Sequence, residues 1–207
     1  MDISYENLNL KSLKTVIEEL AVTFTNQETM SKALAVPSQD LQKIFESFVP
    51  NSLENSYIAK DKNKVVGGMI SNDFAFFFNS SFPEGLSFEL QAIMELLTEL
   101  EQRFACQFPE LTREGASLYL YTVYVDKMYA EKGIGTNLYK MTEENARKRG
   151  FKNLVSISTG PISQHISIYK QGFKKIDEIK YENFNFKGKA VFSNLENKSC
   201  MIMTKKL

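Results

Sequence analysis

The chain has 207 residues, 43% of them hydrophobic and 24% charged, and its 25 basic and 25 acidic side chains give a formal net charge of zero. This size and balance predict a folded α/β protein and exclude a disordered one, and the lack of a basic excess argues against a nucleic-acid partner. A structural zinc site or a nucleophile–histidine pair would depend on the single histidine, His165, with no CxxC motif or histidine cluster beside it, so we expect neither of these sites and no metal.

We expect a single domain that spans residues 1–207 and lies in the cytoplasm as a monomer or weak dimer. Residues 1–6 have neither the basic nor the apolar region of a secretory signal. The longest apolar runs, such as 74–78, are far too short to cross a bilayer, so no membrane partner is expected. Cys106 and Cys200 form no CxxC motif, which fits a reducing compartment.

The first half of the chain predicts three helices and then a hairpin. Apolar residues recur at three- and four-residue steps on one helix face: Leu13, Ile17, Leu20 and Phe24. A second helix is expected near Gln27, and a third after Pro37 with Ser38 as its cap. Strands at 56–59 and 65–70 flank a polar hairpin connection.

Two features stand out in and after the second of these strands. The Gly67–Gly68 pair indicates a β-bulge or a close backbone approach. Residues 74–78, four phenylalanines and an alanine, continue the strand or open the next loop. Residues 86–103 then predict a long helix with a regular apolar face.

The second half alternates strands and helices. The β-branched and aromatic segment 118–125 predicts a central strand. A helix follows over 133–149, with Ile134 and Leu138 directed inward and Gly150 as its C-terminal stop. The remaining predicted elements are a strand at 154–158, a helix at 163–171, and strands at 173–183 and 199–204.

The connection between the central strand and its helix has the features of an anion-binding site. It reads Ala130, Glu131, Lys132, Gly133, Ile134, Gly135 and Thr136. Unpaired N–H groups and the helix dipole favour negative charge at a helix start, and the two glycines let phosphate oxygens approach the backbone. By itself this GxG fits a tight turn equally well, and it is neither a P-loop nor a three-glycine dinucleotide motif.

Two segments together resemble the GNAT superfamily of acetyltransferases. Residues 125–138 resemble its acetyl-CoA motif, V-x-x-x-x-[R/Q]-x-x-G-x-[G/A], and residues 168–173 resemble its second signature, LY-x-K-x-GF. Ala130 stands where the family has Arg or Gln, and Glu131 stands where Gly is common. The resemblance implies N-acetyltransferase activity with acetyl-CoA as co-substrate. It also implies the α/β (α+β) GNAT fold, a mixed and mostly antiparallel sheet that is splayed at its central strands and flanked by helices.

A narrower resemblance, to the invertebrate arylalkylamine (dopamine-type) N-acetyltransferases, extends over nearly the whole chain. Residues 24–28 resemble that family's F-x-x-[DE]-E-P element, with Gln27 in place of its first acidic residue and Thr29 in place of Pro, and residues 159–163 and 188–192 are laid out similarly. The resemblance implies acetyl transfer to a primary amine, an arylalkylamine such as dopamine, tryptamine or serotonin. The phenylalanines at 74–78 suit an aromatic amine, although core packing accounts for most such rings.

The same resemblances imply roles for individual residues. The backbone at Val123, Tyr124 and Val125 would pair with the pantetheine arm of the co-substrate, and the Val125 amide would polarise the thioester carbonyl. The segment from Ala130 to Thr136 would hold the diphosphate. Glu28 would be the general base, although the local sequence also fits a solvated carboxylate at a helix start.

Three hydroxyl groups near the helix at 163–171 have two interpretations each. Tyr169 stands where the family places a general acid, or it lies on a buried helix face with Ile162 and Ile166. Thr159 and Ser163 are placed like hydroxyls that matter in the arylalkylamine group, or they form an ordinary helix cap.

Three alternative functions remain open at this point. The acceptor could be a polyamine or agmatine, which a pocket with several convergent acids would favour. The chain could be a non-catalytic acyl-CoA-binding module, an interpretation that Ala130 and Glu131 support. A generic nucleotide-binding α/β domain is the third.

Overall fold

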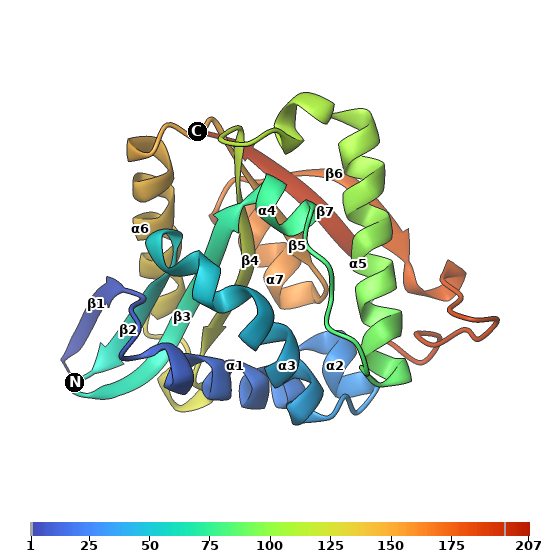
Figure 1. The fold of residues 1–207 in the computed structure, drawn as a ribbon, viewed down its shortest axis with the longest axis horizontal. Coiled ribbons are helices and arrows are strands. Elements are labelled where there is room, and N and C mark those ends of the chain that lie inside the picture. The colour runs from blue at the N-terminus through green and yellow to red at the C-terminus, as the bar shows by residue number, and fades with distance from the viewer. Residues whose placement is uncertain (1, 197) are drawn as a thin grey trace.

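The structure of the chain, a computed structural model, describes residues 2–196 and 198–207 (Figure 1). Its strands are β1 (Ile3–Asn7), β2 (Tyr57–Asp61), β3 (Lys64–Asp73), β4 (Ser117–Val125), β5 (Asn153–Ser158), β6 (Lys174–Lys180) and β7 (Ser199–Lys206). Its α-helices are α1 (Leu13–Gln27), α2 (Thr29–Ala33), α3 (Ser38–Phe48), α4 (Phe74–Phe78), α5 (Phe88–Gln107), α6 (Ile134–Lys148) and α7 (Pro161–His165). A π-helical turn at Ile166–Lys170 directly follows α7.

The strands form one mixed sheet in the order β1-β2-β3-β4-β5-β7-β6. Neighbouring strands are antiparallel except for β4 and β5, which are parallel. Figure 1 shows α6 on one side of the sheet and α1, α3 and α5 on the other. This arrangement confirms the predicted fold, a mixed and mostly antiparallel sheet flanked by helices.

The two central strands separate after their first four paired residues. β4 pairs with β5 from Ser117 to Leu120 only, opposite Asn153 to Ser156. Beyond that point β4 continues beside β3, and β5 continues beside β7. A register shift between Ile70 and Ser71 leaves Tyr121 as an extra residue in β4, and such a bulge bends and twists the strand. The predicted splay is therefore present, and it opens toward the C-terminal ends of both strands.

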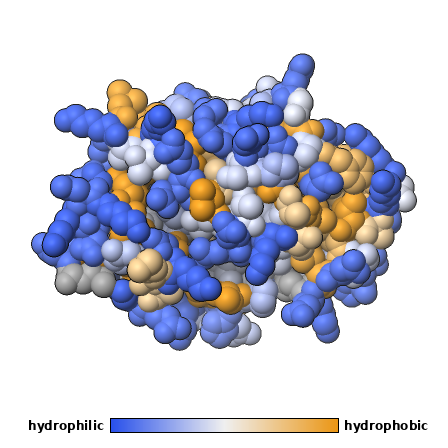
Figure 2. Space-filling model, turned by 90° about the horizontal axis from the view of Figure 1, so that it is seen from below, coloured by the Kyte–Doolittle hydropathy of each residue, from blue (hydrophilic) through white to orange (hydrophobic). Residues whose placement is uncertain are grey.

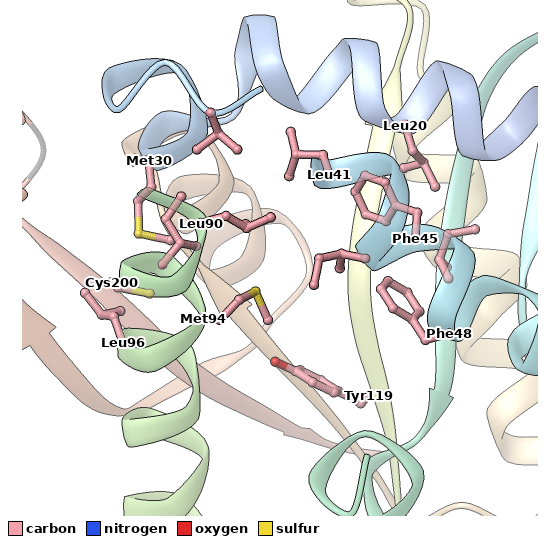
Figure 3. Close-up of a cluster of buried hydrophobic side chains, with 14 of the residues drawn as sticks. Leu20, Met30, Leu41, Phe45, Phe48, Leu90, Met94, Leu96, Tyr119 and Cys200 are labelled. Atoms are coloured by element: carbon pink, nitrogen blue, oxygen red, sulfur yellow. The ribbon is translucent and has the colours of Figure 1, made fainter. Parts of the chain in front are cut away.

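Each face of the sheet has its own hydrophobic core, because side chains alternate in direction along β4. Leu118 and Leu120 share one core with Ile134 of α6. Tyr119 and Tyr121 belong to the other, which is built from α1, α3 and α5 and which we call the front core. Figure 3 shows part of the front core, with the Tyr119 hydroxyl directed toward α5.

The paired glycines of β3 allow a close approach to β4. A Cβ atom at Gly68 would lie 2.7 Å from Cε1 of Tyr124, and one at Gly67 would lie 2.9 Å from the Tyr124 carbonyl oxygen. Larger residues would therefore force the two strands apart. A register shift also lies between Ala59 and Lys60 of β2, opposite this part of β3. The bulge and the close approach that the sequence predicts are both present.

In the first half of the chain the structure differs from the sequence predictions at three places. Residues 74–78 form the helix α4 rather than a strand or loop, because the Asp73 carboxylate accepts the Ala75 amide at 2.9 Å and caps a helix start. Ser38 is the first residue of α3, and Pro37 occupies the cap position without a side-chain hydrogen bond. Strand β1, which no sequence pattern indicated, extends the sheet by pairing with β2.

The outer surface is mixed in polarity. Figure 2 views the molecule from below Figure 1, the side on which α1 and α2 lie, and shows apolar patches separated by hydrophilic side chains. Within the part of the chain that the structure describes, no helix is both long and apolar enough to cross a membrane.

Candidate functional site

The loop before α6 presents a row of backbone N–H groups. Gly133, with a left-handed φ of 75°, precedes the first helical residue, and Glu131 has a φ of 62°. The first helical N–H that donates back is that of Asn137, to the Gly133 carbonyl at 3.0 Å. Among the described residues, none accepts a hydrogen bond from the six N–H groups of residues 131–136. Six unpaired amides at the positive end of a helix suit the binding of an anion.

Two of the predicted loop residues differ from this pattern. The N–H of Ala130 already donates to the Lys127 carbonyl at 3.2 Å, so it does not belong to the row of unpaired amides. Ile134 can offer only its amide, because its side chain is 1% exposed and packs in the core beneath α6. The anion-binding surface therefore consists of main chain from Glu131 onward.

The charged side chains of the loop lie at its surface. The Lys132 ammonium donates to the Met128 carbonyl at 3.1 Å and lies 4.8 Å from the centroid of the Tyr129 ring. The Glu131 side chain is exposed, so its carboxylate is hydrated rather than enclosed with the amides. The loop thus keeps one positive charge close to its backbone.

The edge of β4 that faces the splay carries backbone groups from Val123 and Val125. Asp126 donates its N–H to the Val66 carbonyl of β3 at 2.9 Å. Because backbone groups alternate in direction along a strand, the Tyr124 amide and carbonyl also face β3, whereas those of Val123 and Val125 face the other way. β5 does not pair with this part of β4, so these groups line the splay.

Glu28 and Thr159, 131 residues apart in the sequence, meet at the C-terminal end of β5. The Thr159 hydroxyl donates to Oε1 of Glu28 at 2.5 Å. The half-buried Glu28 carboxylate also accepts the amides of Met30 at 3.0 Å and Ser31 at 2.7 Å, and so caps α2. An ionised carboxylate has about four acceptor positions, so one remains for an external donor. Glu28 is thus a helix cap, as the local sequence allows, and also the carboxylate nearest Thr159.

The backbone around Thr159 is held from both sides. The buried Tyr181 donates its hydroxyl to the Thr159 carbonyl at 2.8 Å. Gly160 lies against Thr29, where an added Cβ atom would be 2.2 Å from the Thr29 hydroxyl oxygen. The Ser163 hydroxyl donates to the Gly160 carbonyl at 2.9 Å, which fits the capping alternative for Ser163. Contacts from three parts of the chain therefore position Thr159 against Glu28.

Tyr169 lies at the surface. Its side chain is 74% exposed and that of Ile162 is 76% exposed, so the predicted buried helix face is wrong for these two residues, whereas Ile166 is partly buried against the core beneath α6. Gln164 and Ser167 are buried instead. The reason is geometric: α7 begins two residues earlier than predicted and continues into a π-helical turn, which changes the face that meets the sheet. The phenol of Tyr169 is accessible from solvent.

Aromatic rings cover the front-core face of β4. Tyr121 stacks on Phe77 of α4, with centroids 4.7 Å apart and planes 10° apart, and Phe48 of α3 lies 4.3 Å from Tyr121. Tyr119 lies 5.4 Å from Phe77. Phe74 is fully buried, as core packing requires, whereas Phe77 and Tyr121 are only partly buried. These partly buried rings form an aromatic wall next to the splay.

One buried carboxylate has no counterpart in the sequence predictions. Glu101 of α5 is 9% exposed and accepts the Tyr119 hydroxyl at 2.8 Å. Burial raises the pKa of Glu101 to about 7, against the opposing effect of that hydrogen bond. No local signal marks this residue, because α5 contains several other glutamates and the helical period alone does not separate them. Within the described ranges, no group of three or more His, Cys, Asp or Glu side chains could hold a metal ion.

Comparisons with known proteins agree with the fold. A model of the acetyltransferase (GNAT) family matches residues 15–173. None of the curated proteins compared with the chain matches it. The chain is similar to the structure of arylalkylamine N-acetyltransferase 2 from Aedes aegypti, with 22% identity, a TM-score of 0.78, and coverage of 100% of this chain and 99% of that one.

Two further solved structures are similar over 100% of both chains. One is the Drosophila melanogaster polyamine N-acetyltransferase that forms N-acetylagmatine, with 15% identity and a TM-score of 0.76. The other is the C-terminal condensation domain of Ebony in complex with beta-alanyl-dopamine, with 14% identity and a TM-score of 0.81. At these identities the likeness concerns the fold alone.

Proposed function

This chain belongs to the GNAT acetyltransferase family and is an acetyl-CoA-dependent N-acetyltransferase, and we propose that its acceptor is an arylalkylamine such as dopamine, tryptamine or serotonin. The observation that carries this proposal is the hydrogen bond between Glu28 and Thr159, on the side of the sheet that bears the aromatic wall. Val155 and Ile157 contribute to the front core, so alternation along β5 directs Thr159 to that same side.

The co-substrate fits the residues at the splay. The unpaired amides of residues 131–136 would hold the diphosphate, because they have no acceptor within residues 2–196 and 198–207 and lie at the start of a helix. The Val123 and Val125 backbone groups would pair with the amides of the pantetheine arm as an added strand would. When bound, acetyl-CoA supplies the activated acetyl group.

Glu28 is proposed as the general base. An amine reaches the site as an ammonium ion and must lose a proton before its nitrogen can attack the thioester carbonyl. Glu28 has one acceptor position left for that proton, directly or through a water molecule, while Thr159 and the α2 amides keep the carboxylate in place.

Two further groups would serve the acyl transfer. As the new C–N bond forms, negative charge develops on the carbonyl oxygen, and the Val125 amide is the proposed donor to it. The C–S bond then breaks and the thiolate of coenzyme A takes up a proton. The exposed Tyr169 phenol is the proposed proton donor.

A thiol-release assay tests the acceptor class with acetyl-CoA and dopamine, tryptamine, agmatine and putrescine. We expect kcat/KM for the two aromatic amines to exceed that for agmatine and putrescine by at least about 10-fold, the discrimination that an apolar aromatic site supplies. A preference for agmatine or putrescine would assign the enzyme to polyamines instead. Coenzyme binding without turnover of any amine would make the chain a binding module.

The base is tested with Glu28→Gln, which keeps one acceptor oxygen for an α2 amide and cannot take a proton. Removing a general base lowers kcat/KM by roughly 100- to 10,000-fold, and the acidic limb of the pH profile should disappear. Glu18→Gln makes the same change at an exposed position of α1 and should leave the rate unchanged. A near-normal pH profile of Glu28→Gln would rule out the base.

A further inference from the structure

The proposed mechanism makes no use of Glu101, the buried carboxylate of the front core. Its Oε1 accepts the Tyr119 hydroxyl at 2.8 Å. Among residues 2–196 and 198–207, no basic side chain pairs with Glu101 and no donor contacts its Oε2. Burying a charge without a counter-ion is unfavourable, and such groups in native proteins are common at functional sites. One oxygen of this carboxylate therefore has no hydrogen-bond donor among the described residues.

The strand register places Tyr119, the partner of Glu101, nearer the N-terminal ends of β4 and β5 than Thr159, the partner of the proposed base. Tyr119, the partner of Glu101, lies opposite Val155 in the parallel β4–β5 pair. Thr159, the partner of Glu28, follows four residues later and faces the same side, about 13 Å further along the strand at ~3.3 Å per residue. An extended para-hydroxylated phenethylamine, with a hydrogen bond of about 2.8 Å at each end, has a length of this order.

Aromatic rings lie between the two carboxylates. Tyr121 is two residues nearer the splay than Tyr119 and on the same face of β4, and it stacks on Phe77. Both rings are partly buried, so the wall beside the splay is apolar and is in part exposed to solvent. In Figure 3, the Tyr119 ring lies below side chains of α3, such as Phe48, with its oxygen toward α5. The ring of an aromatic acceptor whose amine lies at Glu28 would meet this wall before it reached Glu101.

We propose that Glu101 determines acceptor specificity by accepting a hydrogen bond from a phenolic hydroxyl at the far end of the arylalkylamine. The proposal rests on the proposed function, because it takes the amine end of the acceptor to lie at Glu28 and Thr159. The enzyme should therefore prefer phenolic amines such as tyramine and dopamine over phenethylamine.

The contact that Tyr119 makes with Glu101 is a model for the binding of a substrate phenol. Tyr119 already shows that a phenolic hydroxyl donates to this carboxylate within hydrogen-bond distance. A substrate phenol would repeat that contact at Oε2. Burial raises the pKa of Tyr119 and Tyr121 well above the ordinary value, and it raises the pKa of the Cys200 thiol likewise, so these three groups are neutral at physiological pH.

The test compares kcat/KM for tyramine and phenethylamine, which differ only in the hydroxyl. A hydrogen bond to a charged acceptor should give the natural enzyme a tyramine preference of roughly 10- to 100-fold. The double variant Glu101→Met/Tyr119→Phe replaces both hydrogen-bonding partners by apolar groups of similar shape, an exchange that folds tolerate well. It should bring the ratio to about 1 or below, because the substrate hydroxyl then enters a site without an acceptor.

Two controls separate specificity from folding. Tyr119→Phe alone keeps the Glu101 acceptor and should retain the preference. Glu95→Gln alters an exposed carboxylate of the same helix and should leave both rates unchanged. A double variant that retains the natural tyramine preference would overturn the proposal. A natural enzyme with equal kcat/KM for tyramine and phenethylamine would overturn it too, and in either case the arylalkylamine function stands. Turnover of agmatine or putrescine without either phenethylamine would instead overturn the proposed function itself.

Discussion

Glu101 should make the stability of the protein depend on pH in a way that a single substitution removes. Its pKa in the folded protein is about 7, raised from the ordinary value of 4.5 by burial. A carboxyl group with a raised folded pKa binds its proton more tightly in the folded than in the unfolded state. The folded state therefore loses stability as the pH rises from about 4.5 to about 7, and the loss is complete above that range.

The size of this effect follows from the same values. At 1.36 kcal/mol per pKa unit, a rise from 4.5 to about 7 corresponds to about 3 kcal/mol of lost stability in the ionised protein. Glu101→Gln keeps the shape of the side chain and an acceptor for the Tyr119 hydroxyl but does not ionise. The variant should match the natural protein near pH 4.5 and exceed its free energy of unfolding by about 3 kcal/mol at pH 8.

Urea unfolding of both proteins at several pH values between 4.5 and 8 measures this difference. Five other carboxylates have lowered pKa values because of hydrogen bonds and ion pairs, namely Glu6, Asp40, Asp126, Glu143 and Glu178. Their contributions are common to both proteins and cancel in the comparison. A stability difference that does not change with pH would refute the assignment of a raised pKa to Glu101.

Three further predictions concern the site. Gly160→Ala should lower the free energy of unfolding by about 1–3 kcal/mol and reduce kcat/KM, because the added Cβ atom meets the Thr29 hydroxyl. Adding Thr29→Ala should restore the stability, and a double variant that stays destabilised would contradict this clash. Gly133 and Gly115 have φ values of 75° and 77° and open space around them, so replacing either by alanine should lower the free energy of unfolding by about 1 kcal/mol and the Tm by ~2–4 °C. Only Gly133→Ala should also weaken coenzyme A binding in calorimetry. Thr159→Val should lower kcat/KM by roughly 10-fold, whereas Thr159→Ser should retain it. Equal kcat/KM values for Thr159→Val and the natural enzyme would show that the hydroxyl is dispensable.

Local patterns predicted most of the fold. Apolar periodicity located α1, α5 and α6, and β-branched content located β4 within one residue of its start at Ser117. The family motif implied the splay, which a single-strand pattern does not encode, because it depends on where the pairing of β4 with β5 stops. The prediction for residues 74–78 is wrong because a single side chain determines their conformation. The Asp73 carboxylate caps α4, so a β-like run of phenylalanines forms a helix.

The site was less accessible from sequence because its contacts are long-range. Glu28 was identified by resemblance, and its contact with Thr159 depends on how α2 and the end of β5 pack together. Glu101 resembles the exposed glutamates of the same helix, and only the fold reveals that it faces Tyr119. The loop before α6 was the easiest part, because glycine spacing and a helix start are local features.

An NMR titration of backbone amides with coenzyme A tests the central claim most directly, that main-chain N–H groups at the start of α6 bind the diphosphate. We expect coenzyme A to cause saturable shifts of the amides from Glu131 to Thr136 and only a small shift of Ala130, whose N–H is already bound. Pantetheine, which lacks the diphosphate, should cause no such shift. Coenzyme A that binds without shifting those amides, or pantetheine that shifts them equally, would contradict it.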